Sequence, residues 1–185
     1  FFQVYAADVK PRLREHTWRQ KEYTIKSKIL PFFEKKRMAE ITSLDIVRWQ
    51  NELMRPDAND EKGYSPTYLR TINNQLTAIL NHAARFYGLN PNPAVRTMKM
   101  GSKDTKEMSF WTKDEYLKFA DVMMEHPRLF VIFEILYWTG IREGELLALT
   151  PDSFDWRRST MRIDKSYQRL SGRDVITDPK TPKSI

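Results

Sequence analysis

Apolar residues recur at spacings of three and four along most of this chain, which predicts a mainly helical protein. The longest stripe of this kind comprises Leu69, Ile72, Leu76, Ile79, Ala83 and Phe86. Ser65 followed by Pro66 is typical of a helix start, and Gly88 with the nearby prolines is typical of a helix end. We therefore predict a long helix over residues 66–87.

Three shorter helices are predicted before this one. They cover residues 2–13, Thr17 to about Leu30, and a segment that begins at Thr42 or Ser43. Thr17 is the predicted N-cap of the second helix, whose apolar face is formed by Trp18, Ile25 and Ile29. The polar, turn-rich residues 55–63 are predicted to form a loop.

The second half of the chain mixes helices with short strands. Thr112 and Glu115 predict a capping box for a helix that runs to about Met124. The apolar spacing that ends at Tyr137 predicts a core helix, which Gly140 terminates in a left-handed conformation. The residues of this stripe are Leu129, Ile132, Phe133, Leu136 and Tyr137. Further on, residues 160–167 and 174–177 predict a β-hairpin.

Prolines and polar residues between the two halves predict two domains. Residues 91–109 combine Pro-Asn-Pro with lysine, glycine and serine, and nothing in their pattern demands burial. We assign residues 1–95 to a helical domain, 96–109 to a linker and 110–185 to a second domain.

Composition narrows the possible chemistry. The chain has 185 residues, a net charge of +7 and no cysteine, so disulfides and thiolate metal sites are excluded. Its three histidines lack metal-ligand spacing, and no glycine-rich nucleotide motif occurs. No apolar run approaches the ~18 residues of a membrane span. We therefore expect no metal, no cofactor and no membrane partner, and a cytoplasmic protein.

The positive charge is concentrated near the N-terminus. Residues 10–37 carry ten basic and three acidic side chains, a balance that favours a polyanionic partner such as double-stranded DNA. Two polar helix faces are candidate DNA contacts: Thr17, Lys21, Thr24 and Lys28 on one helix, and Arg70, Asn74, Thr77 and Asn81 on the long helix. A merely solvated basic face is the alternative interpretation.

The candidate chemistry centres on the run TGIREGELLAL at residues 139–149. Arg142 follows the glycine that ends one apolar helix and precedes another apolar turn. Its planar, always charged guanidinium suits a phosphate or a carboxylate. Glu145, three residues later, can hold the arginine in place, and an ordinary structural ion pair between the two is the alternative.

This run resembles the first catalytic box of the tyrosine recombinases, also called the phage integrase family. Residues 178–184, DPKTPKS, are similar to the lysine-bearing segment of that family, and residues 29–33 and 41–46 resemble its core-binding domain. The resemblance implies a mainly helical, SAM-like core-binding domain followed by a truncated α+β catalytic domain with a small β-hairpin or sheet.

The same resemblance implies a function. It would be site-specific recombination for a phage or other mobile element, through metal-free phosphoryl transfer and a phosphotyrosine intermediate. Arg142 would neutralise the charge on the phosphate, Lys180 would protonate the leaving oxygen, and Glu145 would orient the site. In the family, the HxxR box and the tyrosine nucleophile lie after the lysine segment, past the position of Ile185, so this fragment is expected to bind DNA without cleaving it. The full-length protein would act on the bacterial nucleoid as a homo-tetramer.

Two other functional classes stay open. One is a non-catalytic DNA-binding or regulatory module in which the Arg142–Glu145 pair is structural. The other is a helical interaction domain that uses its basic face for a protein partner.

Overall fold

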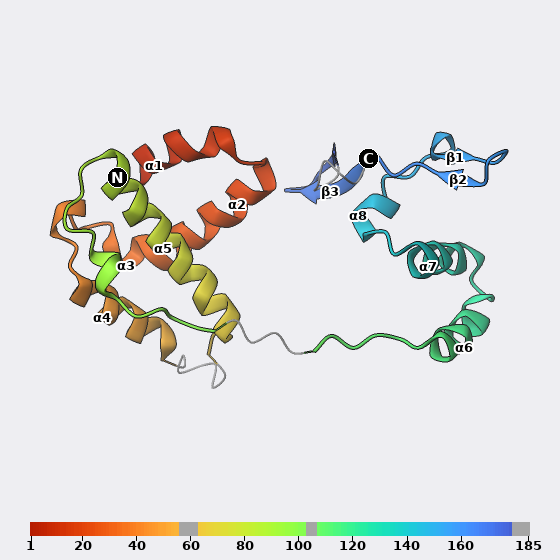
Figure 1. The fold of residues 1–185 in the computed structure, drawn as a ribbon, viewed down its shortest axis with the longest axis horizontal. Helices are drawn as coiled ribbons and strands as arrows, with labels where there is room; N and C mark the ends of the chain where they lie inside the picture. The colour runs from red at the N-terminus through yellow and green to blue at the C-terminus, as the bar shows by residue number, and fades with distance from the viewer. Residues whose placement is uncertain (56–62, 103–106, 179–185) are drawn as a thin grey trace. The chain divides into compact units, whose positions relative to one another are not determined.

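The computed structural model describes residues 1–55, 63–102 and 107–178. Within the chain, Phe1–Glu107 and Met108–Ile185 form two compact units (Figure 1). Lys180 and most of the predicted 55–63 loop lie outside the described residues. The described residues are mainly helical, with two small antiparallel strand pairs.

The first unit is helical throughout its described residues. Its α-helices are α1 (Phe2–Val9), α2 (Glu15–Thr24), α3 (Leu30–Phe33), α4 (Ser43–Met54) and α5 (Pro66–Phe86). Short 3₁₀ turns follow at Lys10–Arg12, Met38–Glu40 and Pro93–Arg96. The predicted helix starts at Thr42 and Ser65 are confirmed, since both side chains accept a hydrogen bond from the third residue of their helix.

The core of this unit forms where α5 packs against the other helices. Ile25, Ile72 and Leu80 are completely buried, and Trp49 is 1% exposed. The apolar stripe of α5 predicted from the sequence supplies much of this core, although Phe86 at its end is 59% exposed. Each large apolar side chain buried in this way contributes roughly 1.5–3 kcal/mol.

A π-helical turn at Ile25–Ile29 separates α2 from α3. Pro31 explains this local widening, because a proline ring clashes with the carbonyl four residues earlier in a regular α-helix. Trp49 Nε1 donates to the Lys28 carbonyl oxygen at 2.8 Å and ties α4 to the turn. The prediction that Thr17 is the N-cap is wrong: Arg14 has the extended cap conformation, and the helix begins at Glu15.

The segment after α5 packs on the first unit as far as Gly101. Pro93 is buried and Met100 is 2% exposed, although nothing in the pattern of residues 91–109 demands burial. Gln50 Nε2 donates to the Met98 carbonyl oxygen and to Asn73 Oδ1, both at 2.8 Å. A Cβ at Gly101 would lie 2.1 Å from the Pro66 carbonyl oxygen, so glycine is required where the chain crosses the start of α5.

The second unit carries three helices followed by strands. Its elements are α6 (Lys113–Met123), α7 (Pro127–Thr139), α8 (Glu143–Leu146), η5 (Pro151–Ser153), β1 (Phe154–Asp155), β2 (Thr160–Met161), β3 (Ser166–Leu170) and β4 (Arg173–Thr177). The capping box at Thr112 and the left-handed Gly140 are confirmed. The predicted hairpin exists as β3 and β4, but its first strand is shorter than expected, since Thr160 and Met161 pair with β1 instead.

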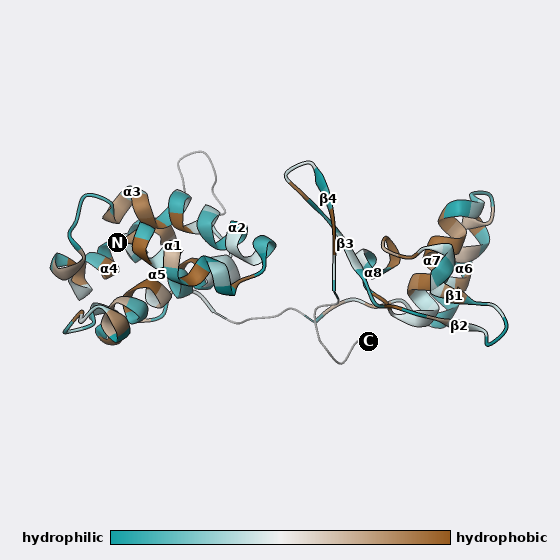
Figure 2. Cartoon of the chain, turned by 90° about the horizontal axis from the view of Figure 1, so that it is seen from above, coloured by the Kyte–Doolittle hydropathy of each residue, from teal (hydrophilic) through white to brown (hydrophobic). Residues whose placement is uncertain are grey.

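Helix α7 differs from its prediction in burial. None of its residues is buried, and Leu129, Val131 and Phe133 are 46%, 53% and 36% exposed. Figure 2 shows apolar residues along α6 and α7. The stripe is apolar as predicted, and α7 packs against α6 and α8, but within the described residues these contacts leave part of the helix uncovered.

No helix in the described part of the chain is long and apolar enough to cross a lipid bilayer.

Candidate functional site

Arg142 is the N-cap residue of α8, two positions after the glycine that ends α7. Its backbone N–H donates to Glu145 Oε2 at 3.0 Å, and its Nη1 donates to Glu145 Oε1 at 2.7 Å. The arginine side chain is 60% exposed and the glutamate side chain only 7%. One buried carboxylate therefore holds the backbone and one donor of Arg142, while most of the guanidinium faces solvent, where an anion can reach it.

The electrostatics of Glu145 favour its charged form. The hydrogen bond from the Arg142 backbone N–H is the largest cause that lowers the pKa of the Glu145 carboxyl, and the guanidinium lowers it further, while burial opposes both. The carboxyl is therefore ionised at neutral pH and places a fixed negative charge in contact with the Arg142 guanidinium.

Gly144 brings strand β3 against this arginine-bearing turn. A Cβ at this position would lie 2.7 Å from the Tyr167 carbonyl oxygen and 2.8 Å from Ser166 Oγ. Glycine inside a helix costs roughly 0.5–1 kcal/mol relative to alanine, so its presence here needs a packing reason, and the contact with β3 supplies one. Sequence reasoning missed this residue, although an isolated glycine within a helical pattern is a usable signal.

Lys180, the third predicted site residue of this region, lies outside the described residues. Strand β4 ends at Thr177, three residues before it in the sequence. Strand β3 of this hairpin packs against α8.

The predicted DNA-contacting face of α2 is only partly open. Thr24 is buried, at 7% exposure, and its hydroxyl donates to the Gln20 carbonyl oxygen, so its assignment to a free face is wrong. Helix α5 packs against α2, a contact that the local pattern does not reveal. Thr17 is exposed.

The two lysines of this face are half-buried and bonded within the first unit. Lys21 Nζ donates to Gln75 Oε1 at 2.5 Å and to the Tyr5 hydroxyl at 3.1 Å. Lys28 Nζ donates to the Tyr64 hydroxyl at 2.5 Å, and this bond raises the pKa of Lys28. Both ammonium groups are thus held in place beside α5. Gln75 and Tyr64 were not predicted, because their partners are 54 and 36 residues away in sequence.

The residues of the predicted polar face of α5 also differ in their exposure to solvent. Asn74 and Asn81 are exposed, and Asn81 Oδ1 accepts a hydrogen bond from Asn92 Nδ2 at 2.8 Å. Arg70 and Thr77 are half-buried, and the Thr77 hydroxyl donates to the Asn73 carbonyl oxygen. Asn74 and Asn81 are therefore the members of this set most open to a ligand.

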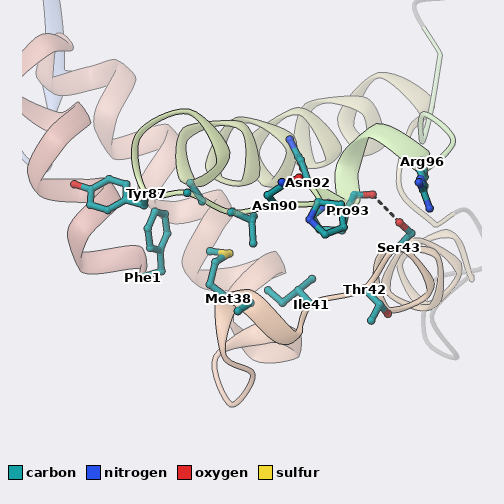
Figure 3. Close-up of a pocket in the computed structure, with 15 residues that line it drawn as sticks. Phe1, Met38, Ile41, Thr42, Ser43, Tyr87, Asn90, Asn92, Pro93 and Arg96 are labelled. Atoms are coloured by element: carbon teal, nitrogen blue, oxygen red, sulfur yellow. Dashed lines mark hydrogen bonds between the residues drawn. The ribbon is translucent and has the colours of Figure 1, made fainter.

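A separate pocket of about 450 Å³ lies beside the end of α5 (Figure 3). Phe1, Met38, Ile41 and Pro93 line it, and Ser43 Oγ donates to the Pro93 carbonyl oxygen at its edge. None of the predicted site residues lines this pocket. Among the described residues, no group of three or more histidine, aspartate or glutamate side chains could hold a metal ion.

Comparison with known proteins shows similarity to integrases. The profile of the phage integrase N-terminal SAM-like domain matches residues 1–54. The ICEBs1 integrase of Bacillus subtilis (strain 168) is 28% identical over 183 residues, which cover 98% of this chain and 48% of that protein. The chain is thus similar to a phage integrase domain over its first 54 residues and to an integrase over nearly all of its length.

Solved structures of integrases share the fold. The Tn1549 transposon integrase in complex with circular intermediate DNA matches with a TM-score of 0.74 at 18% identity, over 95% of this chain and 58% of that one. A lambda integrase tetramer bound to a Holliday junction matches with a TM-score of 0.65 at 19% identity, over 96% of this chain and 47% of that one. The chain thus spans about half the length of the recombinases it matches.

Proposed function

We propose that this chain is the DNA-binding and arginine-bearing part of a site-specific DNA recombinase from a phage or other mobile element. The observation that carries the proposal is the Arg142 turn. The Arg142 guanidinium is exposed, and the buried, ionised Glu145 carboxylate fixes its position. Such a group is suited to bind a phosphate that gains negative charge during transfer.

The proposed reaction is phosphoryl transfer without a metal ion. A tyrosine attacks the scissile phosphate, the phosphorus–oxygen bond to the 5′ side breaks, and the 5′-oxygen takes up a proton as it leaves. Arg142 neutralises the phosphate, Glu145 positions Arg142, and Lys180 donates the proton. The family's HxxR box and tyrosine nucleophile lie after the lysine segment, and neither occurs among residues 181–185, so this portion alone is expected to bind DNA without cleaving it.

The first unit is the proposed DNA-binding domain. Its supporting features are the basic N-terminal region, the two ordered lysines beside α5, and the exposed Asn74 and Asn81. Residues 110–185 are the proposed first part of the catalytic domain. Residues 102–107, instead of 96–109, are the proposed linker, because the chain is docked on the first unit up to Gly101.

The proposed partner is double-stranded DNA at a recombination site. Assembly as a homo-tetramer on DNA is supported by the lambda integrase tetramer, which shares this fold. A DNA substrate places the proposed activity at the bacterial nucleoid, in the cytoplasm.

The decisive experiment compares Arg142→Ala and Lys180→Ala in the complete gene product. Both variants should slow strand cleavage by about 100-fold or more while DNA affinity changes little, because both groups act mainly on the transition state. A substrate with sulfur in place of the bridging 5′-oxygen releases a thiolate that needs no proton. It should restore cleavage by Lys180→Ala and leave Arg142→Ala slow.

Cleavage that both variants perform at the normal rate would show that the Arg142–Glu145 pair is structural and that the chain is a DNA-binding module without this chemistry. Rescue of both variants by the sulfur substrate, or of neither, would show that the roles of the two residues are assigned wrongly.

A further inference from the structure

Lys28 carries a positive charge that a tyrosine holds in place. Its Nζ donates to the Tyr64 hydroxyl at 2.5 Å and lies 4.6 Å from the centre of the Tyr64 ring. In the described part of the chain Lys28 forms no ion pair, whereas Lys26 on the same π-helical turn pairs with Glu22 at 2.7 Å. A neutral partner fixes the ammonium of Lys28 without cancelling its charge, so that charge stays available to an external anion.

Tyr64 is itself anchored in the first unit. Its ring meets the Tyr68 ring edge to face, with the centroids 5.4 Å apart and 66° between the planes. Tyr68 lies in the first turn of α5 and packs against the buried core. Tyr64 is 40% exposed, so it is held by the core and still accessible to a ligand.

The pair of Lys28 and Tyr64 offers two donors to one ligand. The Tyr64 oxygen accepts the bond from Lys28, and within the described residues this hydroxyl makes no other hydrogen bond, so its own proton is free to be donated. The ammonium keeps two of its three protons. Because Nζ and the hydroxyl oxygen are only 2.5 Å apart, their free protons can reach two oxygens of a single phosphate.

We infer that Lys28 and Tyr64 form a two-donor site for one phosphate of the DNA backbone. The inference rests on the proposed function and adds Tyr64 to the DNA-binding surface. The start of α5 favours the same ligand. Tyr64 immediately precedes Ser65, the N-cap of this 21-residue helix, and the partial positive charge at a helix N-terminus attracts an anion.

Lys21 does not form a site of the same kind. Its Nζ donates to Gln75 Oε1 and to the Tyr5 hydroxyl, which leaves it one proton. Tyr5 is 3% exposed, so it is closed to a phosphate. Lys21 can therefore supply a charge, but the exposed hydroxyl that donates beside a lysine is that of Tyr64.

The test measures binding of the 185-residue chain to a fluorescently labelled DNA duplex at several salt concentrations. We expect Tyr64→Phe to weaken binding by about five- to tenfold, because one hydrogen bond to a charged ligand is lost. The slope of log affinity against log salt concentration should change by less than about 0.3, since a neutral hydroxyl releases no counterion. Lys28→Ala should weaken binding and also reduce the slope by about 0.9.

Tyr87→Phe is the matched control. Tyr87 is 50% exposed, and its hydroxyl donates to Asp8 Oδ2 at 2.5 Å. It follows the opposite end of α5, and a helix of 21 residues is about 30 Å long. The affinity and the salt slope of Tyr87→Phe should match those of the unsubstituted chain.

A variant that combines Tyr64→Phe with Lys28→Ala tests whether the two groups share one phosphate. If they do, the hydroxyl contributes less once the ammonium that orients and polarises it is gone. Tyr64→Phe should then weaken binding by less than about twofold in the Lys28→Ala background. Circular dichroism establishes that each variant assayed is folded.

Three results would overturn the inference and leave the proposed function intact, provided that the unsubstituted chain binds the duplex. Unchanged affinity of Tyr64→Phe would show that the hydroxyl only restrains Lys28. A slope reduced by about 0.9 in Tyr64→Phe would show that the hydroxyl acts by placing the lysine charge. Losses that multiply in the combined variant would place the two groups at different phosphates. A chain that binds no duplex at all would instead contradict the proposed DNA-binding domain, and this inference would fail with it.

Discussion

Asp45 illustrates how one buried carboxylate stabilises two parts of the first unit. Its Oδ2 accepts hydrogen bonds from the Thr42 backbone N–H at 3.0 Å and from the Thr42 hydroxyl at 2.9 Å, which caps α4. Its Oδ1 accepts a hydrogen bond from Lys36 Nζ at 2.6 Å, which fixes the loop before the helix. The bond from Lys36, followed by those from Thr42, lowers the pKa of Asp45 to about 2.

This depressed pKa predicts a loss of stability in acid. The folded-state pKa lies below the ordinary value of 3.8, so the stabilisation is fully present above about pH 4 and is lost as the pH falls toward 2. Urea unfolding should show that Asp45→Asn lowers the free energy of unfolding at pH 6 by on the order of 2 kcal/mol. The difference from the unsubstituted protein should shrink at pH 2.5.

The matched control is Glu40→Gln, since Glu40 forms a surface ion pair with Arg37 and is 61% exposed. It should change the free energy of unfolding by less than about 1 kcal/mol at either pH. A stability difference for Asp45→Asn that is independent of pH would contradict the assignment of the charge as its cause.

At the scale of whole elements, the sequence predicts where a helix begins or ends better than it predicts which other elements cover its faces. Thr42, Ser65 and Thr112 cap helices through contacts with residues three positions away, so a short window contains all the information. Helix α2 also packs against α5, and the bond between them joins Lys21 to Gln75, 54 residues further along the chain. No periodicity within α2 could therefore show which of its faces is covered.

The same distinction applies to the candidate site. Arg142 and Glu145 were identified together because their contact spans one helical turn. Gly144 escaped notice because its neighbours, Ser166 and Tyr167, belong to a strand whose docking on α8 no local pattern specifies. The π-helical turn before Pro31 is only partly predictable from the sequence. The proline indicates that the helix is disturbed there, but not that the disturbance takes the form of a π-helical turn.

The face formed by α2 and the π-helical turn leads to a prediction about DNA binding. Lys21 and Lys28 are held beside α5 as cations, and each can neutralise one phosphate. Replacing both by alanine should reduce the slope of log affinity against log salt concentration by about one to two units, because each contact contributes about 0.9. Fluorescence anisotropy with duplex DNA at several salt concentrations measures this slope.

Lys26→Ala provides the control on the same helical segment. Lys26 pairs with Glu22 at 2.7 Å and, at five residues from Lys21, projects from another side of the helix. For Lys26→Ala, the slope of log affinity against log salt concentration should match that of the unsubstituted chain. An unchanged slope in the double variant would remove this face from the proposed DNA contact.

At the scale of the whole molecule, the two units differ in how completely this chain covers their helices. In the first unit, apolar residues from six helical segments close around Trp49 and Ile72. In the second, α7 has no buried residue, and Trp138 is 56% exposed. The sequence predicts the apolar stripe of α7, but the number of elements that pack on a stripe is a property of the fold.

The docked segment from Pro93 to Gly101 predicts where a protease separates the units. Gln50 holds the Met98 carbonyl oxygen and Met100 is buried, so the peptide bond after Lys99 should be protected from trypsin. Cleavage should occur first after Lys103 or Lys106, near the boundary at Glu107, and leave two fragments that mass spectrometry identifies. Earlier cleavage within α5 would contradict the division into two units.

The close contact of Gly101 with the start of α5 also bears on how the two units act on one ligand. Only six residues separate Gly101 from Met108, so the two Cα atoms can lie at most about 25 Å apart. When the first unit is bound to DNA, the second is therefore confined to a small volume around it. A short connection of this kind gives an effective concentration in the millimolar range. The Arg142 site can then be occupied by DNA even when its own affinity for DNA is weak, because the first unit holds the DNA nearby.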